Sequence, residues 1–363
     1  MVVLAASRDT GGTNGVLPVA RELQKDFDVV YLASGRAIEI LTASGEKFET
    51  LNSPDEVLAK YPNIAGLVTS MCYSGNAGVG RDLVPRLRGL CPTVAIQDLW
   101  GAQMKTSWKD PLYRPDYLCV NDRLGSEIAV KAWPDFESSR IVEAGFPALD
   151  KYQNYDSDLI ASEGRMVLNI RADLPVVMFG GQGDGSAEAL AEVVAALNEI
   201  DQTLYFIPRG HPNMKSDYAH EVEPWNKALG TYKGQGLIRN SQDVKTPAIL
   251  ALSSVVISMY STLLLEAAVL RKPNIAILYP DSMARLEFER EAGGILDDPA
   301  TVSLGCTAKA TNRDNLKDLL TQALNGDLER KLRREQEKYL QLDGKNARRI
   351  ADFIRRAIHQ FHN

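Results

Sequence analysis

The chain has 363 residues, of which 45% are hydrophobic and 24% are charged. This composition is typical of a soluble globular protein, and the length suffices for two ordinary domains. The net charge of −6 argues against a general nucleic-acid-binding protein, because such a protein needs a surplus of Lys and Arg to neutralise phosphates.

Cysteine usage and hydropathy predict the compartment. The four cysteines lie far apart without metal-binding spacing, so we expect reduced thiols. The first nine residues lack the charged start of a signal peptide, and no run approaches the roughly 18 apolar residues of a membrane span. We therefore expect a cytoplasmic protein. Residues 328–363 carry ten Lys/Arg against five Asp/Glu, which indicates either peripheral contact with the inner membrane face or a solvated helix face.

The first 33 residues read as strand, loop, helix and strand. Residues 2–6 form the apolar strand, residues 7–15 a small-residue loop, and Pro18 falls in the first turn of the helix. After the second strand, Ser34-Gly35-Arg36 offers no carboxylate for a ribose, which disfavours a dinucleotide-binding domain. The Gly11-Gly12 pair predicts either a loop lying against a substrate or a tight turn without a ligand.

Further strand-and-helix units fill the first half of the chain. The strand expected at 93–96 runs into Asp98, and polar groups just past the carboxyl end of a strand are where open α/β sheets bind ligands. Asp98 is therefore a candidate catalytic acid. The segment 152–165 is polar and weakly patterned, and it divides the chain.

The second half starts again with an apolar strand at 176–179, which is followed by a glycine-rich stretch from Gly180 to Gly185 and a helix. Glycines at such a turn let the main chain approach a diphosphate. The spacing Gly181-x-Gly183-x-x-Ser186 lacks the last glycine of the dinucleotide fingerprint, so a nicotinamide cofactor is disfavoured.

A further strand at 203–207 leads to Arg209 and His211. A guanidinium suits the geometry of a diphosphate, and a histidine donates to phosphate oxygens when protonated or moves a proton near neutral pH. The alternative for His211 is the ordinary one, in which a loop histidine is structural or solvated.

The segment 255–278 predicts a strand, a helix and another strand. Ser261 and Thr262 stand where the helix starts, and the unpaired N–H groups and positive dipole of a helix start bind phosphates. Glu266 follows about one turn later, within reach of a ribose whose phosphates rest on that helix start. The alternative is an ordinary capped helix with Glu266 on its solvated face.

These segments together resemble the GT-B superfamily, which includes nucleotide-sugar glycosyltransferases, UDP-N-acetylglucosamine 2-epimerases and CDP-glycerol polyol-phosphate transferases. The resemblance spans most of the chain, and it depends on the order of short motifs at strand ends: Gly11-Gly12, Gly145-x-Pro147, Gly180-Gly181, His211-Pro212 and Ser261 to Pro273. It implies an α/β fold of two Rossmann-like domains facing across a cleft. The expected parts are an acceptor-side domain at 1–155, a nucleotide-donor domain at 156–340, and a helix at 341–363 returning to the first domain.

The resemblance also implies where substrates bind. The expected nucleotide and phosphate site consists of Gly180, Gly181, Gly183, Arg209, Ser261, Thr262 and Glu266. The expected acceptor-side loop holds Gly11, Gly12 and Asn14, with Asp9 beside them. The catalytic candidates are His211, Asp98 and Asp9, of which His211 acts on the diphosphate or serves as base. No Asp-x-Asp follows a strand in this sequence, so we predict chemistry without a metal or another cofactor.

The sequence thus predicts a metal-independent GT-B glycosyltransferase. It would move a sugar or a polyol phosphate from a UDP- or CDP-activated donor to a hydroxyl acceptor, including a lipid-linked one, in surface polysaccharide or glycoconjugate biosynthesis. One alternative is an epimerase-like enzyme, although its relatives carry consecutive glutamates where this chain has Glu266-Ala267. The second alternative is a nucleotide-sugar-binding module without turnover.

Overall fold

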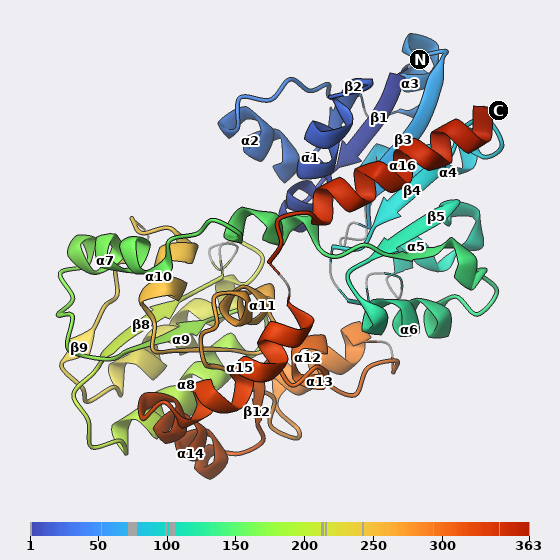
Figure 1. The fold of residues 1–363 in the computed structure, drawn as a ribbon. Coiled ribbons are helices and arrows are strands. Elements are labelled where there is room, and N and C mark those ends of the chain that lie inside the picture. The colour runs from blue at the N-terminus through green and yellow to red at the C-terminus, as the bar shows by residue number, and fades with distance from the viewer. Residues whose placement is uncertain are drawn as a thin grey trace. The chain divides into compact units, whose positions relative to one another are not determined.

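The computed structural model describes residues 2–51, 53–71, 78–98, 100–101, 103, 106–211, 214, 216–241, 243–292, 294–340 and 342–362. The chain divides into two compact units (Figure 1). Unit 1 comprises Met1–Gln153 with Leu342–Asn363, and unit 2 comprises Asn154–Gln341. Each unit is built around one parallel six-stranded sheet with helices on both faces.

The sheet of unit 1 has the strand order β2-β1-β3-β4-β5-β6, and all its pairs are parallel. Because β2 lies on one side of β1 and β3 on the other, the chain reverses its direction of travel between β1 and β3. Ligands in open α/β sheets bind at such switch points, beyond the carboxyl ends of the strands. The strands are β1 Val2–Ser7, β2 Asp28–Ala33, β3 Ile64–Ser70, β4 Thr93–Ile96, β5 Tyr117–Val120 and β6 Ile141–Glu143.

Helices cover both faces of this sheet, which is why its strands are near-continuous apolar runs. One apolar cluster joins α1 and α16 to the sheet, and a second joins α3 and α4 to it. The helices of unit 1 are α1 Thr10–Leu23, α2 Arg36–Ala43, α3 Pro54–Lys60, α4 Gly78–Leu87, α5 Thr106–Lys109, α6 Arg123–Ala132 and α16 Asn346–His362, with short 3₁₀ turns η2 Pro111–Tyr113, η3 Ser138–Arg140 and η4 Pro147–Tyr152.

Helix α1 corrects one expectation. The loop predicted at 7–15 is instead mostly helix, because α1 starts at Thr10 and includes the glycines. Asp9 caps the helix, since its Oδ1 accepts the Gly12 N–H at 2.7 Å. Pro18 consequently lies in the helix interior rather than in its first turn. The glycines therefore serve close packing within a helix, not loop flexibility.

Helix α16 packs on α1, its distant neighbour in sequence, as Figure 1 shows. The Asp150 carboxylate, in η4, holds its start by accepting the main-chain N–H groups of Asn346 at 3.1 Å and Ala347 at 2.8 Å. Gly145 has a positive φ of 86°, and a Cβ there would lie 1.8 Å from Asn346 Oδ1. The Gly145-x-Pro147-x-x-Asp150 passage thus docks the last helix.

The sheet of unit 2 has the order β12-β11-β10-β7-β8-β9, again parallel throughout. The first strand, β7, has β8 and β9 on one side and β10 to β12 on the other, so the switch point lies between β7 and β10. The strands are β7 Val176–Gly180, β8 Tyr205–Arg209, β9 Gly236–Leu237, β10 Val255–Ser258, β11 Asn274–Ile277 and β12 Ala308–Ala310.

Two apolar clusters again lie against this sheet. One involves α8, α9 and α14, and the other involves α10 and α11. The helices of unit 2 are α7 Ser157–Val167, α8 Ser186–Asn198, α9 Val222–Gly230, α10 Thr246–Leu252, α11 Thr262–Val269, α12 Met283–Ala292, α13 Ala300–Ser303, α14 Arg313–Leu324 and α15 Asp327–Tyr339, with the 3₁₀ turn η5 Ala219–Glu221.

Three of the cysteines, Cys91, Cys119 and Cys306, are buried and form no disulfide among the described residues. Burial raises the pKa of Cys91 and of Cys119 to about 12, so both thiols are protonated and unreactive at neutral pH. Cys72 lies outside the described residues.

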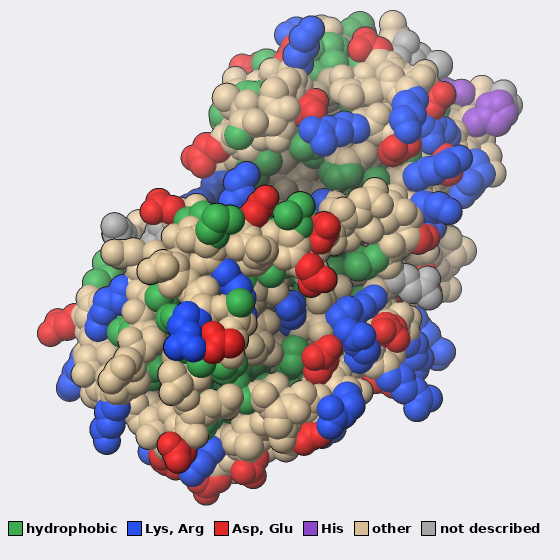
Figure 2. Space-filling view, turned by 60° about the vertical axis from the view of Figure 1, so that its left-hand side comes forward, with side chains coloured by type: hydrophobic (Ala, Val, Ile, Leu, Met, Phe, Trp, Pro, Cys, Tyr) green, Lys and Arg blue, Asp and Glu red, His purple; other side chains and the backbone are tan. Residues whose placement is uncertain are grey.

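The basic region at 328–363 is split between α15 of unit 2 and α16 of unit 1. Many of its cations pair with acids, as in Arg333–Glu329, Arg348–Asp352, Arg349–Asp343 and Arg355–Asp26. On the face drawn in Figure 2, basic and acidic side chains are interspersed. Among the described residues, no helix is long and apolar enough to cross a bilayer. Peripheral membrane contact stays a prediction.

Candidate functional site

The carboxyl edge of the unit 2 sheet brings most of the predicted nucleotide-site residues to one region. Strand β7 ends at Gly180, β8 ends at Arg209, and β10 is followed by Ser261 at the start of α11. Since all the strands are parallel, their following loops meet at this edge. Ser258 Oγ donates to the Gly180 carbonyl at 2.7 Å and so ties β10 to β7 at the switch point.

The start of α8 is already occupied by a side chain of the protein itself. The buried carboxylate of Glu221, which lies 34 to 36 residues downstream, accepts the Gly185 N–H at 2.8 Å and the Ala187 N–H at 2.7 Å. An anion at a helix start satisfies unpaired N–H groups and complements the helix dipole. Glu221 therefore takes the position at α8 that the glycine motif predicts for a phosphate.

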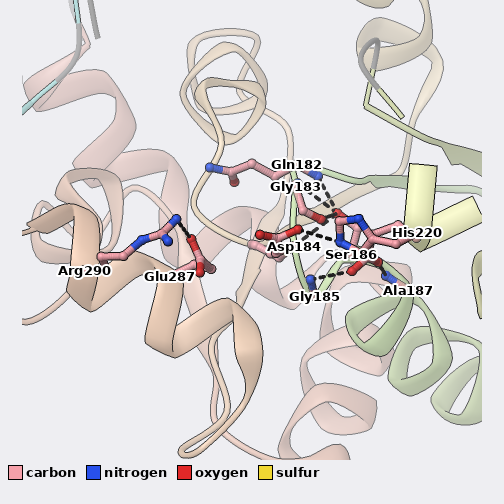
Figure 3. Close-up of polar contacts among 11 residues, drawn as sticks. Gln182, Gly183, Asp184, Gly185, Ser186, Ala187, His220, Glu287 and Arg290 are labelled. Carbon is pink, nitrogen blue, oxygen red and sulfur yellow. Dashed lines mark hydrogen bonds and ion pairs between the residues drawn. The ribbon is translucent and has the colours of Figure 1, made fainter. Parts of the chain in front are cut away.

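The amides of the preceding loop are occupied as well. Ser186 Oγ accepts the N–H groups of Gln182 at 2.8 Å and Gly183 at 3.0 Å, as Figure 3 shows. The Gly181 N–H donates to the Arg209 carbonyl at 2.8 Å. The side chain of Gln182 accepts the Tyr260 N–H at 3.0 Å, which links the two loops at the switch point. Ser186 and Gln182 thus fix the shape of the loop from within.

The three predicted glycines of this loop have neighbours that explain them. A Cβ on Gly180 would lie 2.3 Å from Leu263 Cδ2, and one on Gly181 would lie 2.9 Å from the Trp225 ring. A Cβ on Gly183 would lie 3.2 Å from the Tyr218 ring. The missing side chains make room for protein packing, so these glycines do not by themselves indicate a ligand.

Three side chains beside the same loop could coordinate a metal by their spacing. The ligand atoms of Asp184, His220 and Glu221 all lie within 4.8 Å of one another. His220 Nε2 and Asp184 Oδ1 form a hydrogen bond of 2.8 Å, drawn in Figure 3. The Glu221 carboxylate already receives two N–H groups at the positive end of α8, and a positive helix end disfavours a cation. The arrangement favours internal pairing over metal binding.

The start of α11 differs from that of α8, because within the described part of the chain its side-chain cap is local. Ser261 Oγ accepts the Leu263 N–H at 3.2 Å, and Thr262 is exposed. Glu266 lies on the same helix close to Tyr155, whose pKa is raised by burial first and by the charge of Glu266 second. Within the described residues, no distant acidic side chain caps this helix start, in contrast to Glu221 at α8.

Arg209 is the last residue of β8, and His211 lies two residues beyond it. Arg209 Nη1 donates to the Val244 carbonyl at 3.0 Å, and burial lowers the pKa of the guanidinium. The His211 ring meets the Tyr218 ring edge to face, with centroids 5.3 Å apart. Pro212, the second residue of the His-Pro motif, lies outside the described residues. Both side chains are thus placed at the same sheet edge as Ser261.

In unit 1, the predicted residues gather at the carboxyl edge near the switch point. A Cβ on Gly11 would lie 3.2 Å from Asp98 Oδ2, and one on Gly12 would lie 2.2 Å from Ser70 Oγ. The start of α1 therefore rests against Asp98, which directly follows β4 and is 6% exposed. Asn14 is half-buried one turn along α1. The structure brings Asp9, Gly11 and Asp98 together, with Asp9 acting as the helix cap.

Asp122, one strand further along this edge, was not singled out from the sequence. It caps α6 by accepting the Gly125 N–H at 2.8 Å, and it accepts Trp100 Nε1–H at 3.0 Å. Burial raises the pKa of its carboxyl group. Its position after β5 is the same signal that identified Asp98, so the sequence pattern could have found it. Glu221 has no such signal, because it reaches α8 from a separate segment.

Comparison with known families gives one match. The model of the family described as CDP-glycerol:poly(glycerophosphate) glycerophosphotransferase matches residues 94–356. This range includes Asp98 and every predicted residue of unit 2, whereas the acceptor-side residues Asp9 to Asn14 precede it. Among curated proteins, none matches the sequence significantly.

Solved structures similar to this chain include three different enzymes. The UDP-GlcNAc 2-epimerase of Neisseria meningitidis bound to UDP-GlcNAc has a TM-score of 0.69 at 14% identity, with 98% of this chain and 100% of that chain covered. The wall teichoic acid polymerase TagF, soaked with CDPG, has a TM-score of 0.60 at 15% identity, covering 99% and 89%. A glycosyltransferase from Rickettsia africae has a TM-score of 0.65 at 12% identity, covering 98% of each. The predicted GT-B fold of two Rossmann-like units is confirmed.

Proposed function

The chain belongs to the CDP-glycerol:poly(glycerophosphate) glycerophosphotransferase family, and from this membership we propose that it transfers glycerol phosphate from CDP-glycerol to a hydroxyl group of a polyol-phosphate polymer. The observation that carries the proposal is that the family match spans both the carboxyl edge of unit 2 and Asp98 of unit 1. The product would be a cell-surface polymer longer by one unit. Of the two donor groups predicted from the sequence, this favours polyol phosphate over sugar.

In the proposed reaction, the acceptor oxygen attacks the phosphorus that bears glycerol. A new oxygen–phosphorus bond forms, and the bond from that phosphorus to the bridging oxygen of the diphosphate breaks. CMP leaves with the bridging oxygen, and the acceptor proton passes to a base. The enzyme must therefore stabilise the negative charge that develops on CMP and must activate a hydroxyl group.

We place the donor on unit 2. The start of α11 at Ser261 and Thr262 would receive the phosphates, because its only side-chain cap among the described residues is Ser261 itself. Glu266 would accept hydrogen bonds from the ribose. Arg209 and His211 would donate to the leaving phosphate as its charge grows. The glycines at 180, 181 and 183 would shape this site through packing rather than bind the phosphates directly.

We place the acceptor on unit 1 and assign the base role to Asp98. Asp9 caps α1, and Asp98 is a buried carboxylate after β4 that lies against the start of the same helix. A buried carboxylate at a strand end is a suitable acceptor for a hydroxyl proton. Transfer by this arrangement would need no divalent cation.

The test is a donor panel with the purified chain. CDP-glycerol with a short glycerol phosphate oligomer should release CMP and lengthen the oligomer by one unit per CMP, as mass spectrometry measures. UDP-GlcNAc should neither release UDP nor yield the 2-epimer. Epimer formation would support the epimerase reading instead, and tight CDP-glycerol binding without CMP release would support a binding module. Either outcome would overturn the proposed transfer.

A further inference from the structure

Three residues that follow three neighbouring strands lie at the carboxyl edge of unit 1, around the switch point. Arg8 comes directly after β1, Ser34 comes directly after β2, and Gly78 starts α4, which follows β3. The sheet order β2-β1-β3 places these strands side by side. The three residues therefore meet at one edge.

Distances from the glycines show how closely Arg8, Ser34 and Gly78 lie together. A Cβ on Gly78, where φ is 75°, would lie 3.3 Å from Ser34 Oγ and 3.5 Å from Arg8 Cβ. A Cβ on Gly35, where φ is 54°, would lie 3.2 Å from Arg8 Cγ. The stem of Arg8 is thus confined between two glycines. Side chains at either glycine would displace the arginine.

Among the described residues, neither the Arg8 guanidinium nor the Ser34 hydroxyl has a hydrogen-bond partner. Arg8 is half-buried, and within the part of the chain that the structure describes its guanidinium forms neither an ion pair nor a hydrogen bond. Ser34 is 9% exposed, and its hydroxyl has no hydrogen bond to any described residue. Withdrawing such groups from water without partners is unfavourable, so their placement indicates a ligand.

The surroundings favour a negative ligand. Helix α4 starts at Gly78, is 10 residues long and has no acidic residue in its first turn. Helix α2 starts beside Ser34, and its cap residue Gly35 provides no side-chain hydrogen bond. The start of α4 lies beside the Arg8 side chain and the Ser34 hydroxyl, whereas at the start of α2 the Ala37 N–H already donates to the Arg8 carbonyl at 3.0 Å. Such a combination suits the oxygens of a phosphate group, which the arginine can bind in a bidentate manner.

The geometry points to a phosphate-binding site formed by Arg8 and Ser34, and the ligand is a phosphodiester of the polymeric acceptor. This assignment rests on the proposed function, in which unit 1 holds a polymer with one phosphate per repeat. Asp98, which follows β4 at the same edge, would receive the proton of the terminal hydroxyl, while Arg8 and Ser34 hold a phosphate of the same chain. The site would set the preference for charged polymers over neutral polyols.

The test measures binding to the full-length chain by isothermal titration calorimetry. The probes are a short glycerol phosphate oligomer, a neutral polyglycerol of equal length, and CMP. Arg8→Gln should weaken binding of the charged oligomer by about 10-fold or more, and Ser34→Ala should weaken it by about 3-fold. The affinity of Arg8→Lys should lie between those of the wild type and Arg8→Gln, since lysine keeps the positive charge but cannot bind two phosphate oxygens as the planar guanidinium does. Binding of CMP should not change.

Arg86→Gln is the matched control, because it removes one positive charge from the far end of α4, where Arg86 pairs with Asp55 on the surface. It should leave every affinity unchanged. Thermal unfolding verifies that each variant is folded, and Ser34→Ala carries the test if Arg8→Gln does not fold.

Equal affinity of the wild type for charged and neutral oligomers would overturn the inference. Loss of CMP affinity in Arg8→Gln would overturn it too, because the phosphate would then belong to the donor. Binding of the oligomer through Arg8 in a chain that releases no CMP from CDP-glycerol would uphold the site and refute the proposed function. If the wild type releases CMP but its binding of the oligomer does not depend on Arg8 or Ser34, the proposed function stands and the phosphate site is refuted.

Discussion

The two sheets start with the same local pattern, yet the turns after β1 and β7 are built differently. Each strand lies at the switch point of its sheet and is followed by glycines, which lie inside the first turn of α1 in unit 1 and in the turn before α8 in unit 2. In unit 1 the cap of α1 is its own Asp9, and the glycine at position 11 lies against the carboxylate of Asp98. In unit 2 the cap of α8 is the distant Glu221, and the glycines lie against Leu263, Trp225 and Tyr218.

The difference shows that a glycine-rich turn at a helix start does not identify a phosphate site. What matters is which acceptor takes the first amides and which side chain occupies the space left by the missing Cβ. At α8 the protein itself supplies the acceptor of the first amides and the side chains that fill the space. The turn that connects β7 to α8 thus packs against α9 and does not by itself indicate a ligand. At α1 the space borders the acidic side chain of Asp98, the base in our proposal. Our proposal therefore assigns the donor phosphates to the start of α11 rather than to α8.

Asp98→Asn should have the largest effect and would sharpen this comparison. The substitution keeps the shape of the side chain but removes the base, and loss of general-base catalysis lowers kcat by about 100-fold to 10,000-fold. Affinity for CMP, which binds unit 2 in our proposal, should stay within about twofold. Steady-state kinetics of CMP release measure the first quantity and calorimetry the second.

Asp28→Asn serves as the control, because Asp28 is exposed at the opposite end of β2. Its kinetics should match the wild type. Full activity of Asp98→Asn would mean that the turn in unit 1 is as purely structural as that in unit 2, and the contrast between the two would disappear.

Glu221→Ala addresses the other side of the comparison. It leaves two amides of α8 without their charged acceptor, and each hydrogen bond to a charged group contributes about 1.5 to 3 kcal/mol. The free energy of unfolding should fall by about 3 kcal/mol in urea denaturation. Glu221→Gln keeps one neutral acceptor and should lose about 1 kcal/mol.

The exposed Glu223, two residues along, provides the control, and Glu223→Ala should change the free energy of unfolding by less than about 0.5 kcal/mol. If Glu221→Ala were equally stable and bound CMP more tightly, the start of α8 would be a ligand site that Glu221 merely fills in the free protein.

The sequence predicted the sheets well and the roles of their loops less well, for a physical reason. Strands such as β5 and β7 are continuous apolar runs, and this local pattern survives folding because both faces of the sheet are covered. Positions at strand ends, such as Asp98, follow directly from the strands. The cap of α8 could not be found in this way, because Glu221 is brought to it from another segment by the tertiary fold.

Glycine carries the same ambiguity. The residues 11 and 12 read as a loop because glycine weakens helices, yet Asp9 caps a helix that starts at Thr10. Their small size is needed where α1 touches Ser70 and Asp98, and only the folded sheet reveals these neighbours. Arg8 gave no sequence signal for a related reason, since only the packed structure shows that its guanidinium has no partner among the described residues.

Glu266→Ala tests whether α11 has the donor role that α8 lacks. Removing an acceptor of ribose hydrogen bonds should raise the dissociation constant of CMP by about 10-fold, which corresponds to about 1.4 kcal/mol. The fold should be unaffected, because Glu266 is half-buried on the helix surface. Calorimetric titration of CMP measures the change. Glu163→Ala, at an exposed position on α7, is the control, and equal affinity of both variants would remove the ribose role.

Removal of divalent metal ions should have the smallest effect of all, because we expect it to change neither stability nor activity. A divalent ion held by Asp184, His220 and Glu221 would turn the start of α8 into a ligand site, and the comparison would fail. The ligand atoms of these three residues lie within 4.8 Å of one another, which is close enough to coordinate one ion. However, both carboxylate oxygens of Glu221 accept main-chain N–H groups at the positive end of α8, which disfavours a cation there. Dialysis against EDTA should therefore leave the melting temperature and CMP release unchanged, and His220→Ala should be equally insensitive to Mg²⁺, Mn²⁺ or Zn²⁺. A melting temperature that falls with EDTA and recovers with one of these ions, in the wild type but not in His220→Ala, would place a metal at α8 and make the two turns alike.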